Sequence, residues 1–125
     1  MTKPIGESGE SLAAEFLRGK GLEILALNYW TKAGEIDIIA KDGETLVFVE
    51  VKTRSTTHVA HPEQAVTRKK QQTMNRVAES YMKRNGLLHK VNARFDIVGV
   101  VKDESGALTV EKHAKRAFEA PSRSY

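Results

Sequence analysis

The sequence has no cysteine among its 125 residues. Disulfides, thiolate nucleophiles and zinc sites built on cysteine are therefore excluded. No apolar stretch approaches the roughly 20 residues that cross a bilayer, and residues 1–11 lack the apolar core of a secretion signal. There is also no glycine-rich phosphate-binding loop. These absences predict a cytoplasmic protein without a membrane-spanning segment.

The composition is that of a folded globular protein. Hydrophobic residues make up 40% and charged residues 29% of the chain, values that are ordinary for a soluble domain. The length predicts one domain, over residues 1–118, followed by a flexible tail at 119–125. The net charge of +4 favours an acidic partner such as nucleic acid.

Hydrophobic periodicity predicts helices and strands in alternation. One helix is expected at 8–21, where Ser8 or Ser11 could be the cap, and a second from Pro62 to Asn85. Strands are expected at 22–30, 92–101 and 107–113, and a hairpin of two strands over 34–54. The hairpin turn is placed at Asp42-Gly43, a pair that tight turns favour. The fold class is therefore α/β, a central mixed β-sheet with α-helices on both faces in the order αβββαββ. Tyr29, Trp30 and Phe95 are expected in the core, and residues 114–125 are expected to be loosely held.

Charged residues interrupt the two apolar strands of the hairpin. Side chains alternate along a strand, so Glu50 and Lys52 project from the same face. Asp37 lies on the neighbouring strand, where its carboxylate can approach that of Glu50. Two such carboxylates repel each other, and a hard divalent cation such as Mg²⁺ relieves the repulsion. A lysine beside the cation can orient a water molecule or stabilise charge during attack at phosphorus.

An ordinary ion pair at the end of a strand is the alternative interpretation of Glu50 and Lys52. Glu10 adds a third acid, because a helix that includes it points it toward the buried side. Both interpretations remain open on the residues alone.

The motifs resemble those of a known nuclease superfamily. Asp37 followed by Glu50-Val51-Lys52 resembles the PD-(D/E)xK signature of restriction-endonuclease-like nucleases, although Ile36 stands where that signature has proline. The segments GE at 9–10, GEIDII at 34–39, FVEVKTR at 48–54, VTRKKQ at 66–71 and RFDIV at 94–98 are similar to those of the bacterial YraN family, relatives of archaeal Holliday-junction resolvases. The resemblance covers about residues 5–118.

This resemblance implies a restriction-endonuclease-like core and a role for each matching residue. Asp37 and Glu50 would bind Mg²⁺ or Mn²⁺, with the backbone carbonyl of Val51 as a third ligand. Lys52 would be the catalytic lysine, and Glu10 and Gln71 would complete the site.

Basic residues near these motifs are candidates for nucleic-acid contacts. Arg54, Arg68, Lys69 and Lys70 are expected to meet backbone phosphates. For Arg68 and Lys69, a solvated helix face is the favoured alternative. The four histidines lack metal-ligand spacing, and His58 and His61 are expected to be exposed loop residues. Asp96 is expected to be a structural hydrogen-bonding or surface residue, and the family resemblance leaves open a role as a fourth metal ligand.

The sequence therefore predicts a metal-dependent endonuclease that hydrolyses phosphodiester bonds of structured or branched DNA. The alternative is a nucleic-acid-binding or protein-interaction module that keeps a nuclease-like fold without cutting. DNA is the expected partner in both cases. A homodimer would allow two symmetric cuts, but no pattern in the sequence identifies its surface.

Overall fold

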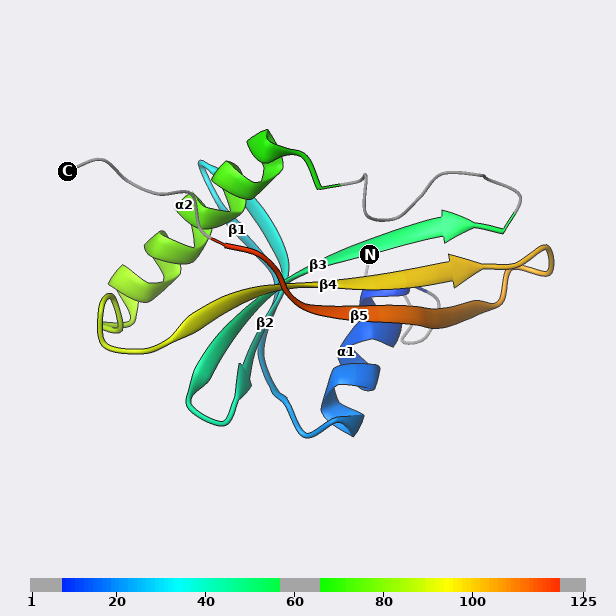
Figure 1. Cartoon of the computed structure of the whole chain (residues 1–125), viewed down its shortest axis with the longest axis horizontal. Coiled ribbons are helices and arrows are strands. Elements are labelled where there is room, and N and C mark those ends of the chain that lie inside the picture. The colour runs from blue at the N-terminus through cyan, green and yellow to red at the C-terminus, as the bar shows by residue number, and fades with distance from the viewer. Residues whose placement is uncertain (1–7, 57–65, 120–125) are drawn as a thin grey trace.

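The computed structural model describes residues 8–56 and 66–119. Within them, a helix, three strands, a second helix and two strands follow one another (Figure 1). Their bounds are α1 Gly9–Gly19, β1 Glu23–Thr31, β2 Gly34–Asp42, β3 Thr45–Ser55, α2 Arg68–Arg84, β4 Ala93–Lys102 and β5 Leu108–Phe118. The predicted α/β class with a mixed β-sheet is confirmed.

The strands form one sheet in the order β1-β2-β3-β4-β5. β1, β2 and β3 are antiparallel neighbours, and β5 is antiparallel to β4. β3 and β4 are parallel, a pairing that a tight turn cannot connect, so α2 forms the crossover between them. α1 and α2 lie on opposite faces of the sheet (Figure 1).

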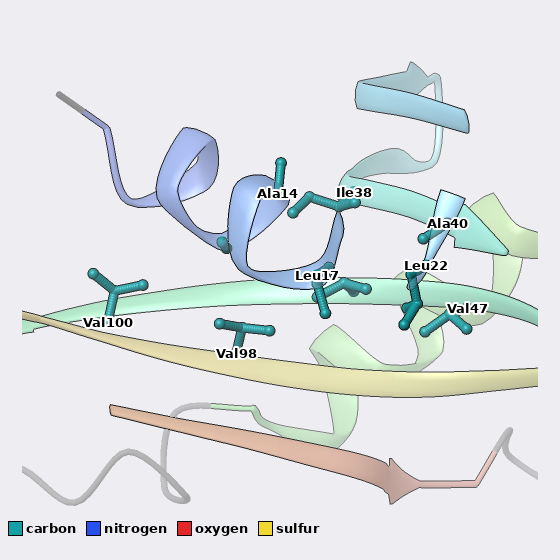
Figure 2. Packing of buried hydrophobic residues seen from close by; sticks show 10 residues of the cluster. Ala14, Leu17, Leu22, Ile38, Ala40, Val47, Val98 and Val100 are labelled. Atoms are coloured by element: carbon teal, nitrogen blue, oxygen red, sulfur yellow. The ribbon is translucent and has the colours of Figure 1, made fainter. Parts of the chain in front are cut away.

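Helix α1 begins where Ser8 caps it. The Ser8 hydroxyl accepts a hydrogen bond from the backbone N–H of Ser11 at 3.0 Å, which satisfies one of the donors left free at a helix start. The cap that the sequence left ambiguous is therefore Ser8. Ala14 and Leu17 lie over the sheet in Figure 2. The cluster on this face, called the α1 cluster, comprises Ala13, Ala14, Leu17, Leu22, Ile38, Ala40, Val47, Val49, Val98 and Val100.

Helix α2 begins later than the sequence predicted. Thr67 is the cap, since its hydroxyl accepts the backbone N–H of Lys70 at 3.1 Å; the helix therefore starts at Arg68 rather than at Pro62, which lies outside the described residues. The cluster between α2 and the sheet, called the α2 cluster, comprises Ile36, Ile39, Leu46, Phe48, Met74, Val77, Ala78 and Phe95.

Two further expectations are wrong. Residues 114–118 are not loosely held, because β5 continues to Phe118, whose ring stacks on Phe95 with centroids 4.9 Å apart. Trp30 is not in the core, since 72% of its surface is exposed. Tyr29 is partly buried against the core on the α2 side, with its ring edge-on to that of Tyr81.

Candidate active site

The two strands of the predicted hairpin are paired at five positions next to their turn and then separate. The turn at Asp42-Gly43 is confirmed, with Gly43 in the left-handed region at φ 62°, and the β2–β3 ladder runs back from it to the pair Ile38 and Val49. At the next residue of β2, Asp37, the side chain binds the backbone of β3. Its Oδ2 accepts the N–H of Val51 at 2.8 Å. Asp37 is thereby fixed against β3 at the point where the strands diverge.

β1 and β2 are both irregular at the same position. The ladder pairs Leu27 with Ile38 and Tyr29 with Ile36, so Asn28 lies opposite Asp37. Asn28 has φ 51°, a left-handed conformation that asparagine tolerates better than most residues.

This irregularity changes the face to which the strands present their side chains. Residues three apart on a regular strand point to opposite faces. Ile36 and Ile39 nevertheless both belong to the α2 cluster, as Ala26 and Tyr29 both pack against it. The switch of face at Asn28 and Asp37 places a polar pair where the hydrophobic pattern is interrupted.

Glu50 follows the regular alternation of β3 toward helix α2. Leu46 and Phe48 belong to the α2 cluster, and Val47 and Val49 to the α1 cluster. Glu50 therefore points to the α2 side, where only 7% of it is exposed. Lys70 Nζ, from the first turn of α2, lies 3.3 Å from Glu50 Oε2.

The surroundings of Glu50 oppose its ionisation. Burial is the largest cause, followed by a hydrogen bond with Asp37 and repulsion from the charge of Asp37; together they raise the pKa of Glu50 to about 7. The positive charges of Lys70 and Lys52 act in the opposite direction and do not cancel the effect. The structure thus brings Asp37, Glu50, Lys52 and Lys70 together, as carboxylates and cations in close electrostatic contact.

Glu10 reaches the same region from helix α1. With the Asn28 amide oriented so that its nitrogen faces the acids, it donates to Glu10 Oε2 and to Glu35 Oε1, each at 2.9 Å. Through this amide, Glu10 is linked to Glu35 on β2, the strand that also carries Asp37. Asn28 and Glu35 were not identified from the sequence. The tolerance of asparagine for positive φ is a signal for Asn28, but it does not single out one asparagine among several.

Two of the remaining predicted residues, Gln71 and Arg54, bind other partners. The Gln71 side chain donates to the backbone carbonyl of Val66 at 3.3 Å and so is directed toward the start of its own helix. The Arg54 guanidinium forms an ion pair with both carboxylate oxygens of Glu111 on β5. Arg68 and Lys69 are exposed at the start of α2. His58 and His61 lie outside the described residues.

The chemistry of the donor set fits a hard divalent cation. Within residues 8–56 and 66–119, no three His, Asp or Glu side chains form a group that could hold a metal ion. A cation at Asp37 and Glu50 would therefore have two protein carboxylates, and Mg²⁺ commonly takes one or two and completes its shell with water and substrate oxygens. Asp37 opposes the ionisation of Glu50, and such a cation would stabilise the negative charge of Glu50.

A second buried acid has a different environment. Asp96 is fully buried and is surrounded by donors: His113 Nε2 lies 2.8 Å from Oδ2, and Arg94 Nε and the backbone N–H of Arg116 bind Oδ1 at 3.1 and 3.0 Å. Burial by itself would raise the pKa of Asp96, but the hydrogen bonds from His113, Arg94 and Arg116 outweigh it and lower the pKa. Arg94 also pairs with Asp42 at 2.9 Å. Asp96 is therefore a structural residue that links β4 to β5, as the sequence predicted.

In the described part of the chain, no helix has both the length and the apolar character needed to cross a membrane.

The sequence is similar to a family of bacterial proteins. The pattern of the uncharacterised protein family UPF0102 matches residues 9–100. A UPF0102 protein of Geotalea daltonii is 42% identical over 117 residues, covering 94% of this chain and 91% of that protein. A UPF0102 protein of Caldicellulosiruptor saccharolyticus is 44% identical over 115 residues, covering 90% of this chain and 97% of that protein. A UPF0102 protein of Alkaliphilus oremlandii is 48% identical over 101 residues, covering 80% of this chain and 86% of that protein. The resemblance to the YraN family is confirmed: the chain belongs to the uncharacterised protein family UPF0102.

Proposed function

We propose that this protein is a divalent-metal-dependent endonuclease with a restriction-endonuclease-like core, acting on structured or branched DNA. The observation that carries the proposal is the pair of carboxyl groups of Asp37 and Glu50, which meet where β2 and β3 diverge. Lys52 lies beside them on the same strand as Glu50. The order of these three residues along the chain is that of the PD-(D/E)xK signature.

Each residue has a defined task in this proposal. Asp37 and Glu50, with the carbonyl of Val51, would hold Mg²⁺ or Mn²⁺, and the bound ion would supply Lewis-acid stabilisation of the phosphate. Lys52 orients the attacking water and stabilises negative charge that develops at phosphorus. Asp37 keeps its position because the N–H of Val51 binds it. Glu10 is held toward the site by Asn28.

Lys70 must give up its present contact for the site to bind a divalent ion. Its ammonium group lies 3.3 Å from Glu50, and the side chain is 37% exposed, so it can turn into solvent at low cost. Released from Glu50, Lys70 is available to a backbone phosphate at the same place. The same ion pair favours a second candidate function, a DNA-binding module in which Lys70 replaces the metal and no cutting occurs.

A cleavage assay distinguishes the two functions. Purified protein is incubated with linear duplex, single-stranded and four-way-junction DNA, with Mg²⁺, with Mn²⁺ and with EDTA. We expect metal-dependent cutting, fastest on the junction. Asp37→Asn and Lys52→Ala are each expected to reduce the rate by roughly a thousandfold or more, about 4 kcal/mol of transition-state stabilisation, because each removes a group that acts on the reacting phosphate.

The matched control is Asp103→Asn, an exposed aspartate in the turn between β4 and β5, which is expected to cut at the wild-type rate. DNA binding that persists in all variants, without cutting by the wild type in either metal, would reject the enzyme and support the binding module.

A further inference from the structure

Trp30 has an unusual position for the one tryptophan of the sequence. Its neighbour Tyr29 packs against α2, whereas Trp30 on the opposite face of β1 is 72% exposed. It is the most exposed of the large hydrophobic side chains in the described residues. Leu25 and Leu27 on the same strand are exposed to a smaller extent. A large exposed indole has a flat apolar surface that a ligand can cover at little cost in conformational entropy.

Trp30 lies close to the proposed active site. It pairs across the ladder with Glu35, whose carboxylate shares the Asn28 amide with Glu10. Asp37 is two residues from Glu35 on β2, a distance of roughly 7 Å along a strand. A group resting on the indole would therefore be near a phosphate that is bound at Asp37.

Two lysines lie near the turn that follows Trp30. Lys32 is exposed in the turn that follows β1. Gly34, at the other end of this turn, packs so closely on α2 that a Cβ there would lie 2.5 Å from Thr73 Cγ2, and Figure 1 shows the turn beside the N-terminal half of α2. Lys69, four residues before Thr73, is on the same side of that helix. Lys32 is thus in the turn, and Lys69 is on the helix that packs against it.

We propose that Trp30 is a stacking platform for an unpaired nucleobase next to the bond that is cut. An indole ring stacks on any base, and exposed lysines bind the flanking phosphates without reading sequence. A base inside an intact duplex already stacks on its neighbours and does not offer its face. The proposal rests on the function proposed above and specifies its substrate: DNA with unpaired or distorted nucleotides at the site, as in a junction or a single strand.

Tryptophan fluorescence reports on this residue alone, because the sequence has no other tryptophan. The full chain in EDTA is titrated with an oligonucleotide, either single-stranded or fully paired with its complement. We expect saturable quenching by the single strand and by a four-way junction, and little change with the duplex. Fluorescence anisotropy of labelled DNA should show that Trp30→Ala weakens single-strand binding by roughly tenfold to a hundredfold, whereas duplex binding changes by less than about twofold.

Two variants control for other effects. Trp30→Phe keeps an aromatic face and should retain most of the single-strand affinity, while Leu27→Ala removes an exposed apolar side chain from the same strand and should leave it unchanged. Equal loss of single-strand and duplex affinity in Trp30→Ala would overturn the proposal. A tryptophan signal that changes with protein concentration instead of with DNA would also overturn it. If that change disappeared in Leu27→Lys, β1 would be an interface between two copies of this chain.

The experiment separates this inference from the proposed enzyme. Quenching and selective binding in EDTA, in a protein that cuts no DNA with either metal, would keep the stacking role and reject the nuclease. Metal-dependent cutting with no response of Trp30 to DNA would keep the nuclease and reject the stacking role. Absence of DNA binding in every condition would reject both.

Discussion

Replacing Glu50 with glutamine is expected to stabilise the protein at neutral and alkaline pH while abolishing divalent-ion binding. The pKa of Glu50 is raised from 4.5 to about 7, chiefly by burial and then by Asp37. Because this pKa is raised in the folded protein, folding favours the protonated form of Glu50. The stability that protonated Glu50 contributes is complete below pH 4.5, the pKa in an unfolded chain, and is lost as the pH rises through about 7.

Glutamine does not ionise, so the Glu50→Gln variant does not lose this stability as the pH rises. Above pH 7 its free energy of unfolding should exceed that of the wild type by about 2 kcal/mol, a value reduced from the full pKa shift because solvent near the site screens the charge. Below pH 4.5 the two proteins should be equally stable, since Glu50 is then protonated. Urea unfolding at both pH values measures the difference.

The control is Glu44→Gln in the exposed turn of the same hairpin, where the same loss of charge should change stability little at either pH. A Glu50→Gln protein that is less stable than the wild type above pH 7 would contradict the account, because it would mean that the ion pair with Lys70 outweighs burial. Glu50→Gln should also lose metal-dependent cutting, since a neutral amide is a poor ligand for Mg²⁺.

Removing the Asp96 carboxylate is expected to destabilise the fold more than any other single change proposed. Asp96→Ala leaves Arg94 and His113 without their buried partner and the N–H of Arg116 without an acceptor. Breaking a buried charge pair in this way costs about 3–5 kcal/mol, which in a chain of this size lowers the melting temperature by about 15 °C. Thermal unfolding followed by circular dichroism measures it.

Asp103→Ala provides the matched control. One oxygen of Asp103 also accepts three hydrogen bonds, from the backbone and side chain of Ser105 and from the N–H of Ala107. Asp103 is exposed, so water can take the place of the carboxylate in these hydrogen bonds. The fall in melting temperature should be several times smaller than for Asp96→Ala. Similar falls in the two variants would show that Asp96 contributes only its hydrogen bonds and that its burial is unimportant.

Local patterns predicted the elements that carry the site. Asp42-Gly43 defined the turn, and the alternation of β3 placed Glu50 and Lys52 on one face, because both features depend on residues near each other in sequence. Proximity of Asp37 to Glu50 followed from the turn position alone. The structure supports that proximity through the shared hydrogen bond.

Features that depend on tertiary contacts were not predicted. Lys70 pairs with Glu50 only because the crossover between β3 and β4 packs α2 against the sheet. The switch of face at Asn28 and Asp37 interrupts the regular alternation of side chains that sequence analysis assumes for a strand. Trp30 was assigned to the core because tryptophan is usually largely buried, but it lies on an edge strand near a turn. Helix α2 was started at Pro62 because proline is common in a first helical turn; Thr67 provides the cap instead.

The measurement that tests the central claim most directly is calorimetric titration of the protein with Mg²⁺ and Mn²⁺ in buffers of different ionisation enthalpy. If Asp37 and Glu50 bind the ion together, Glu50 must lose its proton on binding. Below pH 7 we therefore expect close to one proton released per ion, falling toward zero above pH 7, and no such release in Glu50→Gln. Binding without proton release below pH 7, or binding of equal strength in Glu50→Gln, would contradict a shared site at these two carboxylates.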